Sequence, residues 1–345
     1  MTKIILACDI GYGNTKLVFD KTPTEWNELC FKSSVPKSTQ GLSTLSREMT
    51  SSLDRIAIPV SGAQYLVGPE AHISGGAAIL GTDYIERPEY LALLRGSIYY
   101  MMKKSGVVRK EIDVLALGLP VSNWQLKHVR LSAIGMGPHT IPVPAALREI
   151  HGETVEVTVK RTVVFPQPMG ALHNAMADRT SLDRAGDKTI HMVIDPGYNT
   201  FDWFVSVGVR PDLQRSGSLQ GGVSQLLKLV SNAAGAKLGV GSLNLNEVKR
   251  GLESGQLSSH GKRLDMREFQ PLMQSAAAEV VDRFLNSIDL GLGLDTIHLA
   301  GGGAKFYIEA LRKAFSDYNI MVEESSVMAN ARGFYLLGQS VAATM

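Results

Sequence analysis

Two short segments of similar composition, one in each half of the chain, carry residue types that suit phosphate and a metal ion. They read Asp9-Ile10-Gly11-Tyr12-Gly13-Asn14-Thr15-Lys16 and Asp195-Pro196-Gly197-Tyr198-Asn199-Thr200. Glycine lets backbone N–H groups approach an anion closely, because it has no side chain in the way. An aspartate repels phosphate but suits a Mg²⁺ ion that neutralises phosphate, either directly or through water. The pair therefore predicts a nucleotide site with Mg²⁺, in which Lys16 adds positive charge near the β-phosphate.

Either turn alone is most simply a β-turn between two strands, and only the repetition favours a ligand. A third segment, Gly301-Gly302-Gly303, follows an apolar strand and precedes a helix, so its N–H groups could face a phosphate or a flat ring. By itself this segment is equally well a plain strand–helix turn. The sequence lacks Gly-x-Gly-x-x-Gly and Gly-x-x-x-x-Gly-Lys-Ser/Thr, which argues against Rossmann and P-loop sites. Its eight histidines form no metal-binding pattern.

Apolar runs bounded by turn residues alternate with helical patterns along the chain. The expected strands are Lys3–Cys8, Thr15–Asp20, Ile56–Val60, Gln64–Val67, Asp113–Leu117, Val155–Phe165, His191–Ile194, Phe201–Val207 and Thr296–Leu299. The expected helices are Pro88–Lys104, Met169–Ala177, Gly222–Leu238, Phe269–Leu285, Ala304–Phe315 and Met328–Val341. Because the second half restarts with the same strand–turn–strand pattern, we expect a duplicated α/β unit with a ligand between the halves.

The composition is that of a folded protein of two domains, with 345 residues, 44% of them apolar, and a net charge of +2. So small a charge argues against a surface that coats nucleic acid or a membrane. The two cysteines, Cys8 and Cys30, cannot form a disulfide framework, and we expect both to be buried, reduced thiols. With no export signal or membrane segment evident, the expected location is the cytoplasm.

Five segments resemble the signatures of the actin-like ATPase fold shared by actin, heat-shock chaperones and sugar kinases. They are the two turns as phosphate loops, Pro166–Leu172 as the first connecting segment, Leu299–Ala304 as the adenosine motif and Ala329–Gly338 as the second connecting helix. The ending is similar to that of the ParM/StbA plasmid-segregation proteins. Three segments are also similar to the StbA-like protein D of PRTRC plasmid cassettes: Tyr65–Ala71, Gly118–Val121 and Pro166–Leu172.

The resemblance implies an α/β protein of two duplicated, ribonuclease H-like domains with a nucleotide cleft between them. Domain I would comprise residues 1–165 and 327–345, and domain II residues 166–326. ATP or ADP would occupy the cleft, with Mg²⁺ held through water by Asp9 and Asp195. Gln167 would orient the attacking water, and Asp195 would polarise it, so that the catalytic set is Gln167, Asp195 and Asp9.

The resemblance also implies a set of nucleotide contacts. They are Gly11, Tyr12, Gly13, Asn14, Thr15, Lys16, Gly197, Tyr198, Asn199, Thr200, Gly222, Glu247, Lys249, Arg250, Gly301, Gly302, Gly303 and Lys305. Glu247–Arg250 resembles the helix that clamps adenine and ribose. Pro196 and a second turn one residue shorter depart from the family's usual Gly-Gly-Thr, so the N–H donors in that turn stay open.

By this resemblance, the favoured function is an ATPase that polymerises into filaments for plasmid segregation and reaches DNA through a DNA-binding adaptor protein. Its partners would be further copies of itself and the adaptor, without direct contact to nucleic acid or membrane. Two alternatives remain: a small-molecule kinase of the same fold, and a module that binds nucleotide without forming filaments. A sugar-dependent ATPase activity would favour the kinase.

Overall fold

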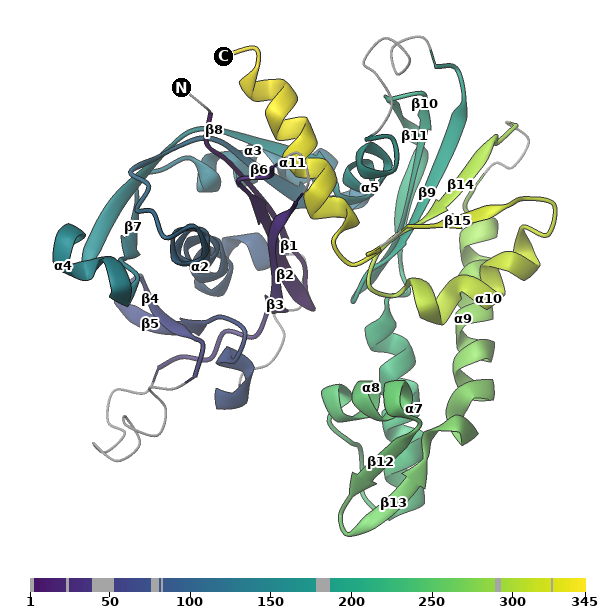
Figure 1. The fold of residues 1–345 in the computed structure, drawn as a ribbon. Helices are drawn as coiled ribbons and strands as arrows, with labels where there is room; N and C mark the ends of the chain where they lie inside the picture. Colours follow the sequence, from purple (N-terminus) through teal and green to yellow (C-terminus); the bar gives the residue numbers. More distant parts are fainter. Residues whose placement is uncertain are drawn as a thin grey trace. The chain divides into compact units, whose positions relative to one another are not determined.

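The structure, a computed structural model, describes residues 3–22, 25–38, 53–75, 81, 83–177, 187–288, 293–323 and 325–345. The chain divides into two compact units (Figure 1). Unit 1 comprises Met1–Asp178 and Met328–Met345, and unit 2 comprises Arg179–Val327.

Unit 1 is built on a six-stranded sheet in the order β3-β2-β1-β6-β8-β7. The strands are β1 (Ile5–Ile10), β2 (Asn14–Phe19), β3 (Asn27–Lys32), β6 (Glu111–Leu119), β7 (His139–Pro142) and β8 (Thr154–Pro166). β1 pairs antiparallel with β2 and parallel with β6, which pairs parallel with β8. All six residues of β1 are buried, because helices cover both faces of the sheet.

Two groups of helices cover these faces. α2 (Pro88–Ser105) and α3 (Val121–Gly135) pack on one face, and α11 (Ala329–Ala342) packs on the other against β1 and β6. Smaller elements complete the unit: β4 (Ile56–Val60) and β5 (Ala63–Val67), which form a separate hairpin, α4 (Arg148–His151), and the 3-10 turns η1 (Ala71–Ser74), η2 (Tyr84–Glu86) and η3 (Ala145–Leu147).

Helix α5 (Gln167–Ala175) follows β8 directly and packs closely on α11. A Cβ added to Gly333 would overlap the backbone of Gly170, and one added to Gly170 would meet the backbone of Asn330. Glycine at these two positions lets the helices touch through their backbones. Because this contact lies within unit 1, the units divide after Asp178, whereas the sequence-based boundary falls after residue 165.

Unit 2 contains a five-stranded sheet in the order β11-β10-β9-β14-β15. The strands are β9 (Ile190–Pro196), β10 (Thr200–Val207), β11 (Arg210–Gln220), β14 (Thr296–Leu299) and β15 (Ile320–Val322). Its other elements are α7 (Val223–Leu238), α8 (Leu245–Ser254), the hairpin β12 (Gln256–Ser259) and β13 (Lys262–Asp265), η4 (Met266–Phe269), α9 (Gln270–Leu285) and α10 (Ala304–Ala314). One face of the sheet forms an apolar core with α7, α9 and α10, in which Phe201 and Trp203 contact Phe284.

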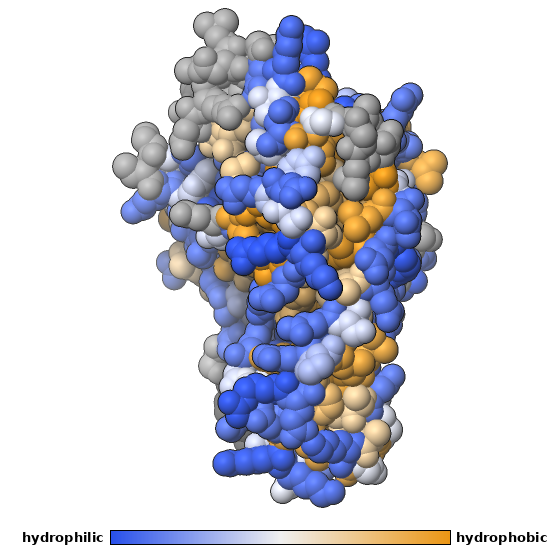
Figure 2. Space-filling model, turned by 90° about the vertical axis from the view of Figure 1, so that its right-hand side faces the viewer, coloured by the Kyte–Doolittle hydropathy of each residue, from blue (hydrophilic) through white to orange (hydrophobic). Residues whose placement is uncertain are grey.

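The side of the molecule that includes β15, α9 and α10 is mainly polar, with apolar side chains between the polar ones (Figure 2). On α10 the exposed positions carry charge, whereas Tyr307 and Leu311 are buried in the core of unit 2. This is the pattern of a helix that packs on one side only. Among the helices that the structure describes, none is long and apolar enough to cross a membrane.

The two sheets share one topology. The shared part has five strands: two antiparallel strands lie on one side of the first strand, and two parallel strands lie on the other. Unit 1 has a sixth strand, β7, which pairs antiparallel with β8 at the edge of the sheet. This repeat confirms the predicted duplication. Every expected strand and helix is present, with the predicted bounds at Ile56–Val60 and Thr296–Leu299 and with shifted ends elsewhere.

Several elements were not predicted from the sequence: β3, β7, α3, α4, β11, the β12–β13 hairpin, β15 and the 3-10 turns. One expectation about the cysteines is wrong. Cys8 is buried in β1, but Cys30 is exposed, because β3 is the edge strand of its sheet and is covered less completely than the central strands.

Candidate functional site

Asp9 is the centre of the first candidate site, and it lies near the end of β1 with no exposed surface. The pairing of β1 with β2 sets Lys16 opposite Asp9, and the Lys16 ammonium lies 2.5 Å from Asp9 Oδ2. Gln167, the first residue of α5, donates from Nε2 to Asp9 Oδ1 over 2.7 Å. Residues predicted from two separate motifs thus meet at the Asp9 carboxylate, whose two oxygens are both hydrogen-bonded.

The turn after Asp9 is a tight hairpin in which the Gly11 N–H donates to the Asn14 carbonyl over 3.0 Å. The Tyr12 ring is buried against Tyr84, with ring centroids 4.6 Å apart, and its hydroxyl donates to the Gly81 carbonyl. The Tyr12 side chain therefore supports the turn from within unit 1, and its backbone is the part that can serve a ligand.

Ser33, which the sequence analysis missed, lies against the same turn and is almost fully buried. Its hydroxyl donates to the Gly11 carbonyl over 2.6 Å, and its N–H donates to the Gly13 carbonyl over 3.1 Å. The Thr15 hydroxyl lies 2.9 Å from Ser33 Oγ. No motif could have revealed Ser33, because it follows an unpredicted strand and is one of two adjacent serines.

The second turn, in unit 2, begins at Asp195, which is 5% exposed near the end of β9. The Gly197 N–H donates to the Thr200 carbonyl over 2.8 Å and closes the hairpin. Backbone groups at the start of α7 then bind the turn. The N–H groups of Gly222, Val223 and Ser224 donate to the carbonyls of Asn199, Gly197 and Tyr198 over 3.1, 3.0 and 2.8 Å.

The Gly301-Gly302-Gly303 segment lies against this second turn. The Gly303 N–H donates to the Pro196 carbonyl over 2.9 Å, and a Cβ added to Gly301 would overlap the Asp195 carboxylate. Gly301 also has a φ of 80°, a conformation that favours glycine. The structure therefore brings together the second turn, Gly222 and the triple glycine, all of which the sequence analysis proposed as nucleotide contacts.

Asp202 is a second buried carboxylate near this turn, and it lies opposite Asp195 in the pairing of β9 with β10. It accepts hydrogen bonds from the hydroxyls of Thr200, over 2.5 Å, and of Ser218. The Thr200 hydroxyl is thus directed to a buried acceptor, as is that of Thr15 in the first turn. Asp202 lies two residues beyond the predicted turn, and the pairing of β10 with β11 brings Ser218 to it.

The remaining predicted contacts lie on α8 and at the start of α10. Asn244 caps α8 by accepting from the Asn246 N–H. Glu247 lies in the first turn of the helix, and Lys249 and Arg250 follow it. The Lys305 ammonium lies 2.7 Å from Glu253, so an ion pair between exposed side chains links α10 to α8. The structure thus directs Lys305 toward Glu253 at the far end of α8.

The carboxylates fit a magnesium ion that is bound largely by water and phosphate. Within the part of the chain that the structure describes, no three histidine, cysteine, aspartate or glutamate residues form a metal-binding group. Mg²⁺ characteristically keeps several waters and takes only one or two carboxylates together with phosphate. Asp9 and Asp195 supply carboxylate oxygens at the head of each turn. The other ligands of a Mg²⁺ ion can be water and phosphate, so further protein ligands are not required.

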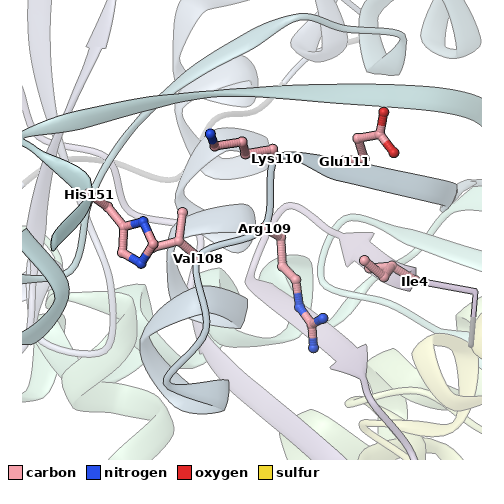
Figure 3. Close-up of a pocket in the computed structure, with 6 residues that line it drawn as sticks. All are labelled: Ile4, Val108, Arg109, Lys110, Glu111 and His151. Carbon is pink, nitrogen blue, oxygen red and sulfur yellow. The ribbon is translucent and has the colours of Figure 1, made fainter. Parts of the chain in front are cut away.

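A pocket at the beginning of β1 is distinct from the Asp9 turn at the other end of that strand. It is lined by Ile4, Val108, Arg109, Lys110, Glu111 and His151. Figure 3 shows that the side chains of Arg109 and Lys110 leave the backbone in different directions and do not converge on one point. None of these residues belongs to the predicted site, and Glu111 forms an ion pair with Lys160.

Comparisons with known proteins agree with this arrangement. Residues 7–170 match the family model for the N-terminal domain of actin-like proteins, and residues 193–313 match that for the C-terminal domain of the archaeal actin homologue MreB-like family. No curated protein matches the sequence significantly.

Several solved structures resemble this one over nearly the whole of both chains. The archaeal actin homolog Ta0583 has 17% identity and a TM-score of 0.76, with 98% of this chain and 99% of that one covered. A ParM filament from Clostridium botulinum has 17% identity and a TM-score of 0.72, with coverage of 99% and 100%. A complex of Ta0583 with ADP has 16% identity and a TM-score of 0.71, with coverage of 98% and 99%. The chain therefore has the actin-like fold, with a match to an actin-like family model in each half.

Proposed function

We propose that this protein is a magnesium-dependent ATPase that polymerises into filaments, and that it acts in plasmid segregation through a DNA-binding adaptor. The observation that carries the proposal is the buried Asp9, bound by both Lys16 and Gln167 at the head of a glycine turn. Even a paired buried carboxylate is often no more stabilising than an apolar side chain in its place, so a buried pair of this kind favours a functional role. The ADP complex of an archaeal actin homolog and the ParM filament support nucleotide binding and self-assembly.

The side chains fit distinct roles in hydrolysis. Because the Gln167 amide donates its N–H to Asp9, its oxygen is the group left to accept a hydrogen bond from a water molecule. We assign Gln167 to orient that water and Asp195 to polarise it. Mg²⁺, when bound through water to Asp9 and Asp195, would neutralise phosphate charge. The triple glycine and α8, with Glu247, Lys249 and Arg250, would receive the adenosine.

The finer identity is a proposal as well. The resemblance of three segments to the StbA-like protein D of PRTRC plasmid cassettes supports a role in plasmid partition, and it implies a cytoplasmic location. The predicted domains, residues 1–165 with 327–345 and residues 166–326, are part of this proposal.

The test combines sedimentation, negative-stain microscopy and phosphate release with Mg-ATP, Mg-ADP or no nucleotide. We expect filaments with Mg-ATP and a loss of phosphate release of at least ~100-fold in Asp195→Asn, because it removes a charge at the reacting phosphate. Asp295→Asn is the matched control, since Asp295 accepts a hydrogen bond from the Ile190 N–H at the other end of β9.

The outcomes separate the alternatives. Nucleotide binding without filaments at high protein concentration would contradict polymerisation and indicate a non-filamentous module. Phosphate transfer that requires a sugar or another small acceptor would indicate a kinase. Equal phosphate release by Asp195→Asn and Asp295→Asn would remove Asp195 from the proposed site.

A further inference from the structure

Ser33 makes three contacts with the first turn from one side. Its hydroxyl donates to the Gly11 carbonyl, its N–H donates to the Gly13 carbonyl, and its Oγ lies 2.9 Å from the Thr15 hydroxyl. Ser33 is 2% exposed and Thr15 is fully buried. One buried residue outside the turn therefore binds both carbonyls of the glycines that make the turn.

The direction of each hydrogen bond follows from simple chemistry. A carbonyl oxygen only accepts, so the single hydroxyl hydrogen of Ser33 is used on Gly11. The hydrogen between Ser33 and Thr15 must then come from Thr15. The Thr15 hydroxyl is thereby committed to Ser33, so its backbone is the part of Thr15 that remains for a phosphate.

The same contacts orient the backbone amides. In a planar trans peptide, the carbonyl of one residue and the N–H of the next point in opposite directions, and no described peptide bond is cis. Because the carbonyls of Gly11 and Gly13 point toward Ser33, the N–H groups of Tyr12 and Asn14 point to the other side of the turn. Two N–H groups directed to one side of a glycine turn form an anion-binding arrangement.

We propose that Ser33 is a positioning residue that holds the first turn so that the N–H groups of Tyr12 and Asn14 face a phosphate group. This proposal rests on the proposed nucleotide-binding function and adds a residue to it. Ser33 does not touch the ligand, since its hydrogen-bonding groups are directed to the turn itself. It determines which side of the turn presents donors.

The direct test is Ser33→Ala, which removes the hydroxyl and keeps the N–H bond to Gly13. Without the hydroxyl, the Gly11–Tyr12 peptide can rotate, and we expect the affinity for Mg-ATP and for pyrophosphate to fall about tenfold, the loss of about one N–H contact to a charged group. Ser97→Ala is the matched control, because Ser97 is also buried in unit 1 but its hydroxyl donates to the Leu93 carbonyl within α2.

Amide hydrogen exchange of residues 11–15 in the nucleotide-free protein gives a readout that does not depend on activity. We expect faster exchange in Ser33→Ala than in Ser97→Ala once both are corrected for overall stability. Should Ser33→Ala fail to fold, Ser33→Cys serves instead, because its thiol is nearly isosteric but a weak donor, and we expect it to weaken pyrophosphate binding as well.

The role of Ser33 and the nucleotide site would be overturned by different results. Binding of pyrophosphate within twofold of the wild type by the folded Ser33 variant, with unchanged exchange at the turn, would remove the role of Ser33. Absence of binding of Mg-ATP and pyrophosphate by the wild type would contradict the nucleotide site, while the exchange measurement would still decide whether Ser33 orders the turn.

Discussion

The two turns have the same residue types but are held in different ways. The first turn is fixed mainly by side chains: the Ser33 hydroxyl binds the Gly11 carbonyl, and Lys16 and Gln167 bind the aspartate. The second turn is fixed by backbone groups, from the start of α7 and from the triple glycine. The first arrangement is lost when a hydroxyl, ammonium or amide group is removed. The second is lost when a side chain replaces a glycine that lets two backbone segments approach each other. Equivalent turns should therefore fail under different substitutions.

The largest effect is expected at the aspartate of the first turn. Lys16→Met leaves the buried Asp9 carboxylate without its ammonium partner, and removal of one member of a buried pair typically costs about 3–5 kcal/mol. We expect a loss of this order in the free energy of unfolding, measured with urea. Lys305→Met is the control, because its pair with Glu253 is exposed and such pairs contribute at most about 1 kcal/mol.

A second change separates charge from packing at the same place. The double variant Asp9→Asn with Lys16→Met removes both charges, so it should recover much of the stability that Lys16→Met loses. If the double variant is less stable than Lys16→Met, the stability lost in Lys16→Met comes from packing. The difference between Lys16→Met and Lys305→Met would then not be electrostatic in origin.

The second turn should be most sensitive to the addition of a methyl group. In Gly222→Ala the new Cβ would lie 2.5 Å from backbone atoms of Asn199, and backbone atoms cannot move aside as a flexible side chain can. We expect a loss of about 3 kcal/mol in the free energy of unfolding. Gly241→Ala in the same unit is the control, because its Cβ would meet no atom within 4 Å. Similar losses of unfolding free energy in Gly222→Ala and Gly241→Ala would argue against close backbone contact as the feature that holds the second turn.

The two threonines provide a direct comparison of buried acceptors. Thr200 donates to the carboxylate of Asp202, whereas Thr15 donates to the hydroxyl of Ser33. Hydrogen bonds to charged groups contribute about 1.5–3 kcal/mol, against about 0.5–1.5 kcal/mol for neutral pairs. Thr200→Val should therefore lower the melting temperature more than Thr15→Val does. The opposite order would mean that Asp202 is not the stronger acceptor.

Much of the architecture could be predicted from the sequence, because it is encoded by local patterns. The repeated Asp-x-Gly-Tyr turns indicated the two hairpins, and the apolar runs located the central strands β1, β6, β9 and β14. The edge strands β3, β7, β11 and β15 were missed, since strands covered on one side, or very short, lack a continuous apolar run.

The parts of the site that the sequence did not reveal depend on contacts between distant segments. Ser33 acts on a turn that lies two strands earlier, and Ser218 reaches Asp202 only through the pairing of β10 with β11. A lone serine has no spacing that could mark it. Lys16 was assigned to a phosphate, and its position in the pairing with Asp9 adds a structural role that a linear motif does not show.

The labelling rates of the two cysteines report on the stability of the first turn, and this is the smallest effect expected here. Burial raises the pKa of the Cys8 thiol to about 12, so Cys8 stays protonated beside Asp9 and should react only when unit 1 opens. Cys30 is exposed on β3, opposite Lys16, and should react quickly in the folded protein. Labelling with a maleimide, followed by mass spectrometry, should show one fast thiol and one slow one. Because Cys8 precedes Asp9 in the same strand, Lys16→Met should speed its labelling more than Gly222→Ala does, and equal acceleration would mean that the two turns are not held independently.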